Sequence, residues 1–138
     1  INVFGEELMV ENADQAIAKT CSQLNCDVKD YTVAPIFMKN KEKGSHEWMI
    51  EFKKTPVDLA LFAKVLDETL QSVNSDYEAK RYNNITLNMP KVHVAQKGLF
   101  HKWMKKNNKI PSYSSRNNKE KQLGNWCQQK RIDKKKNK

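Results

Sequence analysis

Adjacent carboxylates and isolated histidines are the side chains of this sequence that could perform acid–base chemistry. Glu6 and Glu7 lie side by side near the start of the chain, where two carboxylates could act as general acid and general base. Neighbouring side chains usually point apart, however, so a solvent-exposed turn is the simpler interpretation of the pair. His46 and His93 fall in strand-like segments, where a partly buried edge position and a surface position are expected.

The cysteines and histidines form no recognisable metal or disulfide pattern. Cys21, Cys26 and Cys127 are an odd number without a CxxC pair, and the three histidines stand at no metal-ligand spacing to them. Buried packing is the simpler role for Cys21 and Cys26. Gly-rich phosphate loops, GxSxG and HExxH motifs are also absent from the sequence. We therefore expect no metal site, and the free cysteines favour a reducing, cytoplasmic location.

Strands and helices that would position these side chains can be predicted from the apolar pattern. Four segments have the β-branched content or the alternation of strands: residues 1–4, 30–38, 46–52 and 91–95. Three segments repeat apolar residues at helical spacing: residues 12–25, 55–74 and 98–106. Asn12 and Thr55 are the expected N-caps of the first two helices. Pro35 predicts an edge position or a bulge for the second strand.

The order β-α-β-β-α-β-α is typical of a ferredoxin-like, or split βαβ, α+β sandwich. We expect an antiparallel or mixed sheet with helices on one face, which leaves the other face free to meet a partner. No segment approaches the roughly 20 apolar residues of a membrane-spanning helix, and the start lacks the features of a secretory signal. A membrane is therefore not an expected partner.

Positive charge is concentrated at the end of the chain. Residues 1–99 carry 12 Lys and Arg against 14 Asp and Glu, a net charge of −2, whereas residues 100–138 carry 13 against 2, a net charge of +11. We predict a domain over residues 1–106 and a basic, flexible tail over residues 107–138.

The basic tail and the ferredoxin-like order leave open a free-standing interaction or RNA-binding module. Such a module carries aromatic residues on its strands within a basic context. Trp48 and Phe52 lie in one strand, but Glu47 and Glu51 alternate with them and the strand core has no basic residue. Nucleic acid is therefore the alternative partner and not the expected one.

Three stretches together resemble one known family. They are FGEELMVENADQAI, GSHEWMIEF, and LQSVNSDYEAKRYNN followed by KVHVAQKGLFHKWMKK. They resemble the C-terminal domain of the Gretchen Hagen (auxin-responsive) family of acyl-acid-amido synthetases, in its bacterial branch. The most specific part is Asn74 to Tyr77 with Arg81, an Asn-x-x-Tyr-x-x-x-Arg pattern after a long helix. Gly98 to Phe100 and Trp103 fit the following turn, and the resemblance covers residues 1–106.

The resemblance implies an adenylate-forming ligase. These enzymes use ATP and Mg²⁺, bound mainly by a large N-terminal domain, to convert a carboxylic acid into an acyl-adenylate that an amino acid then attacks. The small C-terminal domain is a lid that rotates between the two half-reactions. The chain would thus be the lid, would bind no cofactor by itself and would not be catalytically competent alone. Gly5 and Glu6 would then lie near the inter-domain hinge.

Three residues receive candidate roles from the resemblance. Family lids end in Gln-x-Lys-x-Pro-Arg, and the nearest segment here, Asn107 to Ser112, retains the Lys and the Pro. Lys109 is therefore a candidate partner of the adenylate phosphates, because a mobile cation suits developing negative charge. The alternative interpretation is one surface lysine among many. Tyr77 and Arg81, one helical turn apart, either clamp the long helix to the sheet or contact substrate. The clamp is the simpler interpretation.

Overall fold

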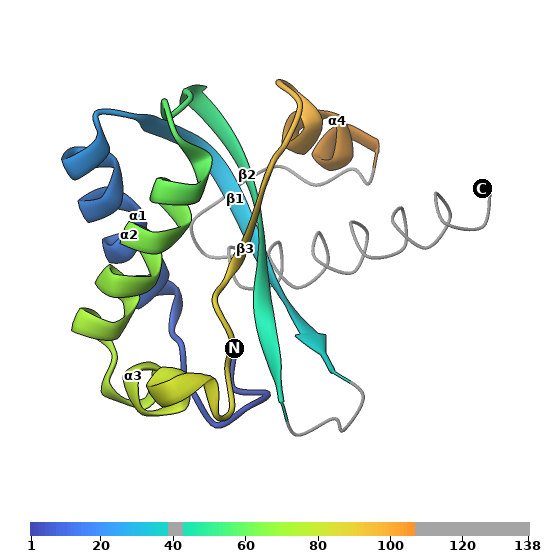
Figure 1. Cartoon of the computed structure of the whole chain (residues 1–138). Coiled ribbons are helices and arrows are strands. Elements are labelled where there is room, and N and C mark those ends of the chain that lie inside the picture. Colours follow the sequence, from blue (N-terminus) through green and yellow to red (C-terminus); the bar gives the residue numbers. More distant parts are fainter. Residues whose placement is uncertain (39–42, 107–138) are drawn as a thin grey trace.

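A computed structural model describes residues 1–38 and 43–106 of the chain (Figure 1). The predicted α+β class is confirmed, and the arrangement is consistent with a ferredoxin-like split βαβ sandwich. The elements in order are α1 (Val10–Leu24), β1 (Asp27–Phe37), β2 (Gly44–Lys54), α2 (Leu59–Val73), α3 (Ser75–Arg81), the 3-10 turn η1 (Tyr82–Asn84), β3 (Lys91–Val94) and α4 (Leu99–Lys106). The predicted basic tail, residues 107–138, lies outside the described residues.

The sheet is mixed and has the order β1-β2-β3. Strands β1 and β2 form an antiparallel pair of eleven-residue strands, whereas β2 and β3 pair in parallel. The parallel pairing follows from the connection through α2 and α3, because parallel neighbours need a crossover and not a tight turn. Pro35 lies in β1 at the sheet edge, as its missing N–H predicts.

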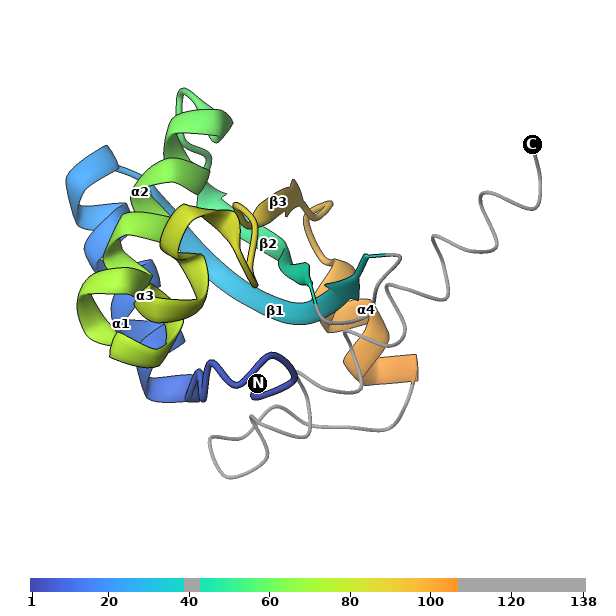
Figure 2. The same cartoon turned by 60° about the horizontal axis from the view of Figure 1, so that its bottom comes forward.

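Helices α1 and α2 cover one face of the sheet, as Figures 1 and 2 show from two sides. The alternation of β2 places Trp48, Ile50 and Phe52 toward this helix layer, and all three are buried in the main core. Phe62 and Leu66 of α2 belong to the same core, and the Phe62 ring meets Phe52 edge-on at 5.2 Å. Each large apolar side chain buried in this way contributes about 1.5–3 kcal/mol.

The helix starts differ from the predicted caps by a few residues. Asp58, and not Thr55, is the N-cap of α2, and its carboxylate accepts a hydrogen bond from the Leu61 N–H at 3.1 Å. Met9 is the N-cap position of α1, while Asn12 lies one turn inside and accepts the Met9 N–H through its side chain. In both helices a short polar side chain still satisfies a free N–H at the helix start.

The predicted first strand, residues 1–4, is not formed, so this part of the β-α-β-β-α-β-α order was wrong. The segment instead closes into a loop, in which the Leu8 N–H donates to the Ile1 carbonyl at 2.8 Å. Gly5 and Glu7 have positive φ angles of 80° and 44°, a conformation that reverses the chain and is incompatible with a strand. The apolar start of the sequence therefore reflects Phe4, which is buried, and not sheet pairing.

The opposite sheet face was also predicted to be free, and this was wrong in part. Met49, which alternates with the core residues of β2, packs against a second cluster formed by Ala95 and by Phe100, Trp103 and Met104 of α4. Figure 1 shows α4 on the side of the sheet away from α1 and α2. Helices therefore lie on both faces. Within residues 1–38 and 43–106, no helix is long and apolar enough to cross a membrane.

Candidate functional site

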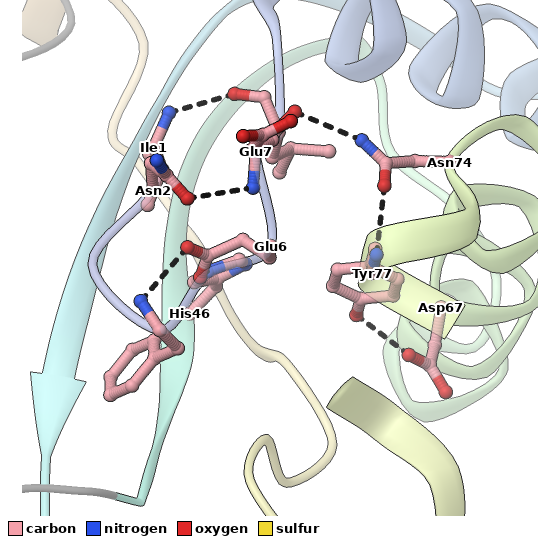
Figure 3. Close-up of polar contacts among 10 residues, drawn as sticks. Ile1, Asn2, Glu6, Glu7, His46, Asp67, Asn74 and Tyr77 are labelled. Atoms are coloured by element: carbon pink, nitrogen blue, oxygen red, sulfur yellow. Dashed lines mark hydrogen bonds and ion pairs between the residues drawn. The ribbon is translucent and has the colours of Figure 1, made fainter. Parts of the chain in front are cut away.

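The carboxylate of Glu6 is completely buried in the N-terminal loop (Figure 3). Its Oε1 accepts the backbone N–H of Phe4 at 3.0 Å, and its Oε2 lies 2.7 Å from Nε2 of His46 on β2. Glu7 is exposed, so the two neighbours do point apart, as predicted. The interpretation of Glu6 as solvent-exposed, and of His46 as an edge residue that is only partly buried, was wrong. The sequence offered no sign that the two would pair.

The hydrogen bonds of Glu6 favour its ionised form. Burial alone would raise the pKa of the Glu6 carboxyl, but the hydrogen bonds from His46 and from the Phe4 N–H outweigh it, and the pKa is lowered. His46 Nδ1 is buried and has no hydrogen-bond partner among the described residues. We therefore assign one N–H to the ring, at Nε2, because a proton on Nδ1 would be a buried donor without an acceptor.

The lowered pKa makes the Glu6 contribution to stability dependent on pH. A carboxyl whose pKa is depressed by folding stabilises the native state above its ordinary value of 4.5, and this stabilisation is lost as the pH falls through the folded value. We expect wild type to exceed Glu6→Gln by about 1–3 kcal/mol in unfolding free energy at neutral pH. The difference should shrink below pH 4.5. Urea unfolding across this range measures it, and Glu11→Gln, an exposed change, should show no such trend.

Tyr77 and Arg81 of α3 converge on Asp67, a buried carboxylate of α2. Figure 3 shows the contact between Tyr77 and Asp67. The Tyr77 hydroxyl donates to Asp67 Oδ1 at 2.7 Å. Arg81 donates to the same carboxylate from Nε at 2.7 Å and from Nη2 at 2.8 Å. This bidentate pairing matches the planar guanidinium to the carboxylate and makes strong, oriented hydrogen bonds.

Arg81 also ties α3 to the segment before β3. Its Nη1 donates to the Leu87 carbonyl at 2.9 Å and to the Asn84 side chain at 2.5 Å. The hydrogen bonds to Asp67 raise the pKa of Arg81, while burial and the Asp67 charge raise the pKa of the Tyr77 hydroxyl. Arg81 thus stays charged and Tyr77 protonated. Every nitrogen of the guanidinium is engaged within the domain, so Tyr77, Arg81 and Asp67 clamp α3 to α2 and to the segment before β3. The alternative role in substrate contact stays a prediction.

Asn74 joins the two polar clusters at the corner between α2 and α3. Its side-chain N–H group donates to the Glu7 carbonyl and to Asn12 Oδ1, both at 3.1 Å, and its Oδ1 accepts the Tyr77 N–H at 2.8 Å. As N-cap of α3 it satisfies a helix-start N–H, and it holds the N-terminal loop against the helix layer. The network therefore runs from the N-terminal loop through Asn74 and Tyr77 to Asp67.

Cys21 and Cys26 behave as packing residues. Cys26 is buried and Cys21 partly buried, and both pack in the main core. Burial, together with the neighbouring Cys26, raises the pKa of the Cys21 thiol to about 12. A nucleophilic cysteine needs the thiolate, which Cys21 does not form at neutral pH.

The comparison with protein families decides which family the chain belongs to. The family model described as GH3 family C-terminal domain matches residues 11–124. The chain belongs to the GH3 family. A search of curated proteins finds no match. The motif resemblance is thereby confirmed at the level of the family and its C-terminal domain.

The GH3 motif residues occupy defined places in the fold. Asn74 caps α3, Tyr77 and Arg81 lie within it, and Trp103 is buried in α4. Gly5 and Glu6 precede the matched range, in the N-terminal loop. Lys109 lies inside the matched range and outside the described residues.

Sequence reasoning missed Asp67 as the centre of the clamp. The signal was present, because Asp67 directly follows Leu66 and precedes Leu70 by three positions on the buried face of α2. A carboxylate within an apolar stripe is rarely buried without a cationic partner. In the structure, Arg81 is the cationic partner of Asp67.

Proposed function

We propose that this chain is the C-terminal lid of an ATP-dependent acyl-acid-amido synthetase of the bacterial branch. Residues 1–106 would form the lid and residues 107–138 its basic tail. The enzyme would join a carboxylic acid to ATP with release of pyrophosphate, and the amine of an amino acid would then displace AMP to form the amide. The supporting observation is the match to the GH3 C-terminal domain over residues 11–124.

In this proposal the lid contributes shape and positioning, and the adenylation domain of the same cytoplasmic chain holds the reactants. No group of three or more His, Cys, Asp or Glu side chains in the described part of the chain could hold a metal ion. The guanidinium of Arg81 is already committed to Asp67, Asn84 and Leu87. The chain's own role is to close the site against water as a pre-formed body.

The proposed reaction class can be tested with the full-length protein. We expect exchange of label between pyrophosphate and ATP that depends on a carboxylic acid from a broad panel. The 138-residue chain alone should show none. Absence of exchange with every acid would overturn the proposal, and RNA binding that weakens steeply with salt would then favour the alternative module.

Lys109 provides a residue-level prediction. In the full-length enzyme, Lys109→Ala should slow acid-dependent exchange by about 10²–10³-fold, because a positioned cation that meets developing phosphate charge is worth this much. Lys102→Ala, an exposed change on α4, is the matched control and should retain the wild-type rate. Equal rates for the two variants would assign the phosphate contact to another residue.

A further inference from the structure

We propose that Glu6 and His46 are positioning residues that latch residues 1–9 onto the domain. In this arrangement the N-terminal loop moves with the lid as one body, and rotation takes place on the N-terminal side of the loop. The inference rests on the proposed function for the rotation, whereas the latch itself follows from contacts within this chain. We refer to the Glu6–His46 pair as the latch.

Hydrogen bonds among residues 1–8 close the N-terminal loop on itself. The Ile1 nitrogen donates a hydrogen bond to the Leu8 carbonyl at 2.7 Å, and the Leu8 N–H donates one to the Ile1 carbonyl at 2.8 Å. Asn2 accepts the Gly5 N–H through its carbonyl and the Glu7 N–H through its side chain. A peptide N–H at position 1 would donate the same bond as the amine, so the closure does not depend on a free terminus.

The loop is anchored to the domain body at separate points. Glu6 meets His46 on β2, and the Glu7 carbonyl accepts the side chain of Asn74 (Figure 3). Phe4 is buried, with its ring centroid 5.4 Å from that of Phe37 on β1. The latch is the fully buried polar anchor, so its loss leaves a carboxylate or an imidazole buried without its partner.

The latch accepts only one arrangement of protons. His46 Nδ1 has no acceptor among the described residues, so Nε2 carries the proton and Glu6 must accept it. A Gln at position 6 has one acceptor oxygen for the two donors that Glu6 accepts, so its N–H group would face either the Phe4 N–H or the His46 proton. A Gln at position 46, in contrast, can still donate to Glu6 from its side-chain nitrogen. The two conservative changes should therefore have opposite outcomes.

An open latch would matter for catalysis because it lengthens the tether of the lid. If residues 1–9 detach from the domain, they lengthen the flexible linker between the lid and the adenylation domain. The effective concentration of the lid at the active site then falls. ATP binding, which the proposed function assigns to the other domain, would be little affected. The latch thus predicts a loss in kcat with little change in the KM for ATP.

Hydrogen exchange on the 138-residue chain tests the latch directly. Glu6→Gln and His46→Leu should speed exchange of the amides of residues 4–8 by at least about tenfold, because those bonds depend on the closed loop. Amides of Ile50 and Leu66 in the main core should keep their protection. His46→Gln and the exposed control Glu11→Gln should behave as wild type. Unchanged protection of residues 4–8 in Glu6→Gln would overturn the latch.

Kinetics of the full-length enzyme test the positioning role. We expect Glu6→Gln and His46→Leu to lower kcat by about tenfold with the KM for ATP within about twofold, and His46→Gln to restore kcat. Lost loop protection with unchanged kcat would overturn the positioning role and leave a purely structural pair. If wild type shows no acid-dependent exchange of pyrophosphate, the proposed function fails instead, and the latch is still judged by hydrogen exchange.

Discussion

Replacing Asp67 by Ala should lower the free energy of unfolding by about 3–5 kcal/mol, because it leaves the Arg81 cation in a largely buried place without its carboxylate. The Arg81 side chain is 10% exposed and the Asp67 side chain 5% exposed, so solvent cannot replace the lost bonds. The Tyr77 hydroxyl loses its acceptor in the same step. Chemical unfolding followed by circular dichroism measures the change.

Two further variants show whether the charge or the packing is responsible. Glu68→Ala, at the neighbouring exposed position of α2, should change stability by less than about 0.5 kcal/mol. Asp67→Asn keeps the side-chain shape and one acceptor, and should fall between Glu68→Ala and Asp67→Ala. A loss of unfolding free energy below about 1 kcal/mol for Asp67→Ala would contradict the clamp. Removing one partner of a buried ion pair leaves the other charge buried without compensation, which costs far more.

Replacing Gly44 by Ala is the second change with a large expected effect. A Cβ at this position would lie 2.1 Å from the Ile36 carbonyl oxygen and 2.5 Å from the Phe4 ring. The backbone of Gly44 is also held on its other side, where its N–H donates to Thr86 O at 3.1 Å and its carbonyl accepts the Asn88 N–H at 2.8 Å. Because β1 lies on one side of Gly44 and residues 86–88 hold its backbone on the other, the added methyl group has no room, and we expect a loss of about 3 kcal/mol or more.

Gly98→Ala is the informative comparison for Gly44→Ala. No atom lies within 4 Å of a Cβ built at Gly98, but its φ of 87° is unfavourable for Ala. We expect a loss of about 1 kcal/mol from this backbone strain alone. Thermal unfolding of both variants separates the two causes, and a smaller effect at Gly44 than at Gly98 would contradict the steric explanation.

The sheet hairpin and the two long helices could be predicted because their apolar patterns are local. Apolar and polar residues alternate within residues 46–52, which is enough to indicate a strand. The apolar residues from Leu61 to Val73 recur at helical spacing, which is enough to indicate a helix. Residues 1–4 show the limit of this reasoning. Val3 and Phe4 have strand-like composition, yet the Gly5 turn and the burial of Phe4 decide their conformation, and four residues are too few to show a period.

The polar network could not be predicted because its pairs are distant in sequence. Glu6 and His46 are 40 positions apart, and Asp67 and Arg81 are 14 apart. Sequence reasoning placed His46 on the apolar face of its strand and Tyr77 and Arg81 on one helix face, both of which the fold retains. Which carboxylate each would meet depends on the packing of α2 against the sheet, and that arises only in three dimensions.

The separation of the Glu6–His46 pair also bears on the order in which the domain can assemble. The β1–β2 hairpin closes a short stretch of chain, whereas β3 pairs with β2 only after α2 and α3 have brought Lys91 beside Glu47. Closing a longer stretch costs more chain entropy, so distant contacts form after local ones. The N-terminal loop needs β2 in place before Glu6 has a partner. Although residues 1–9 are first in the sequence, we therefore expect their amides to gain protection after those of the β1–β2 hairpin.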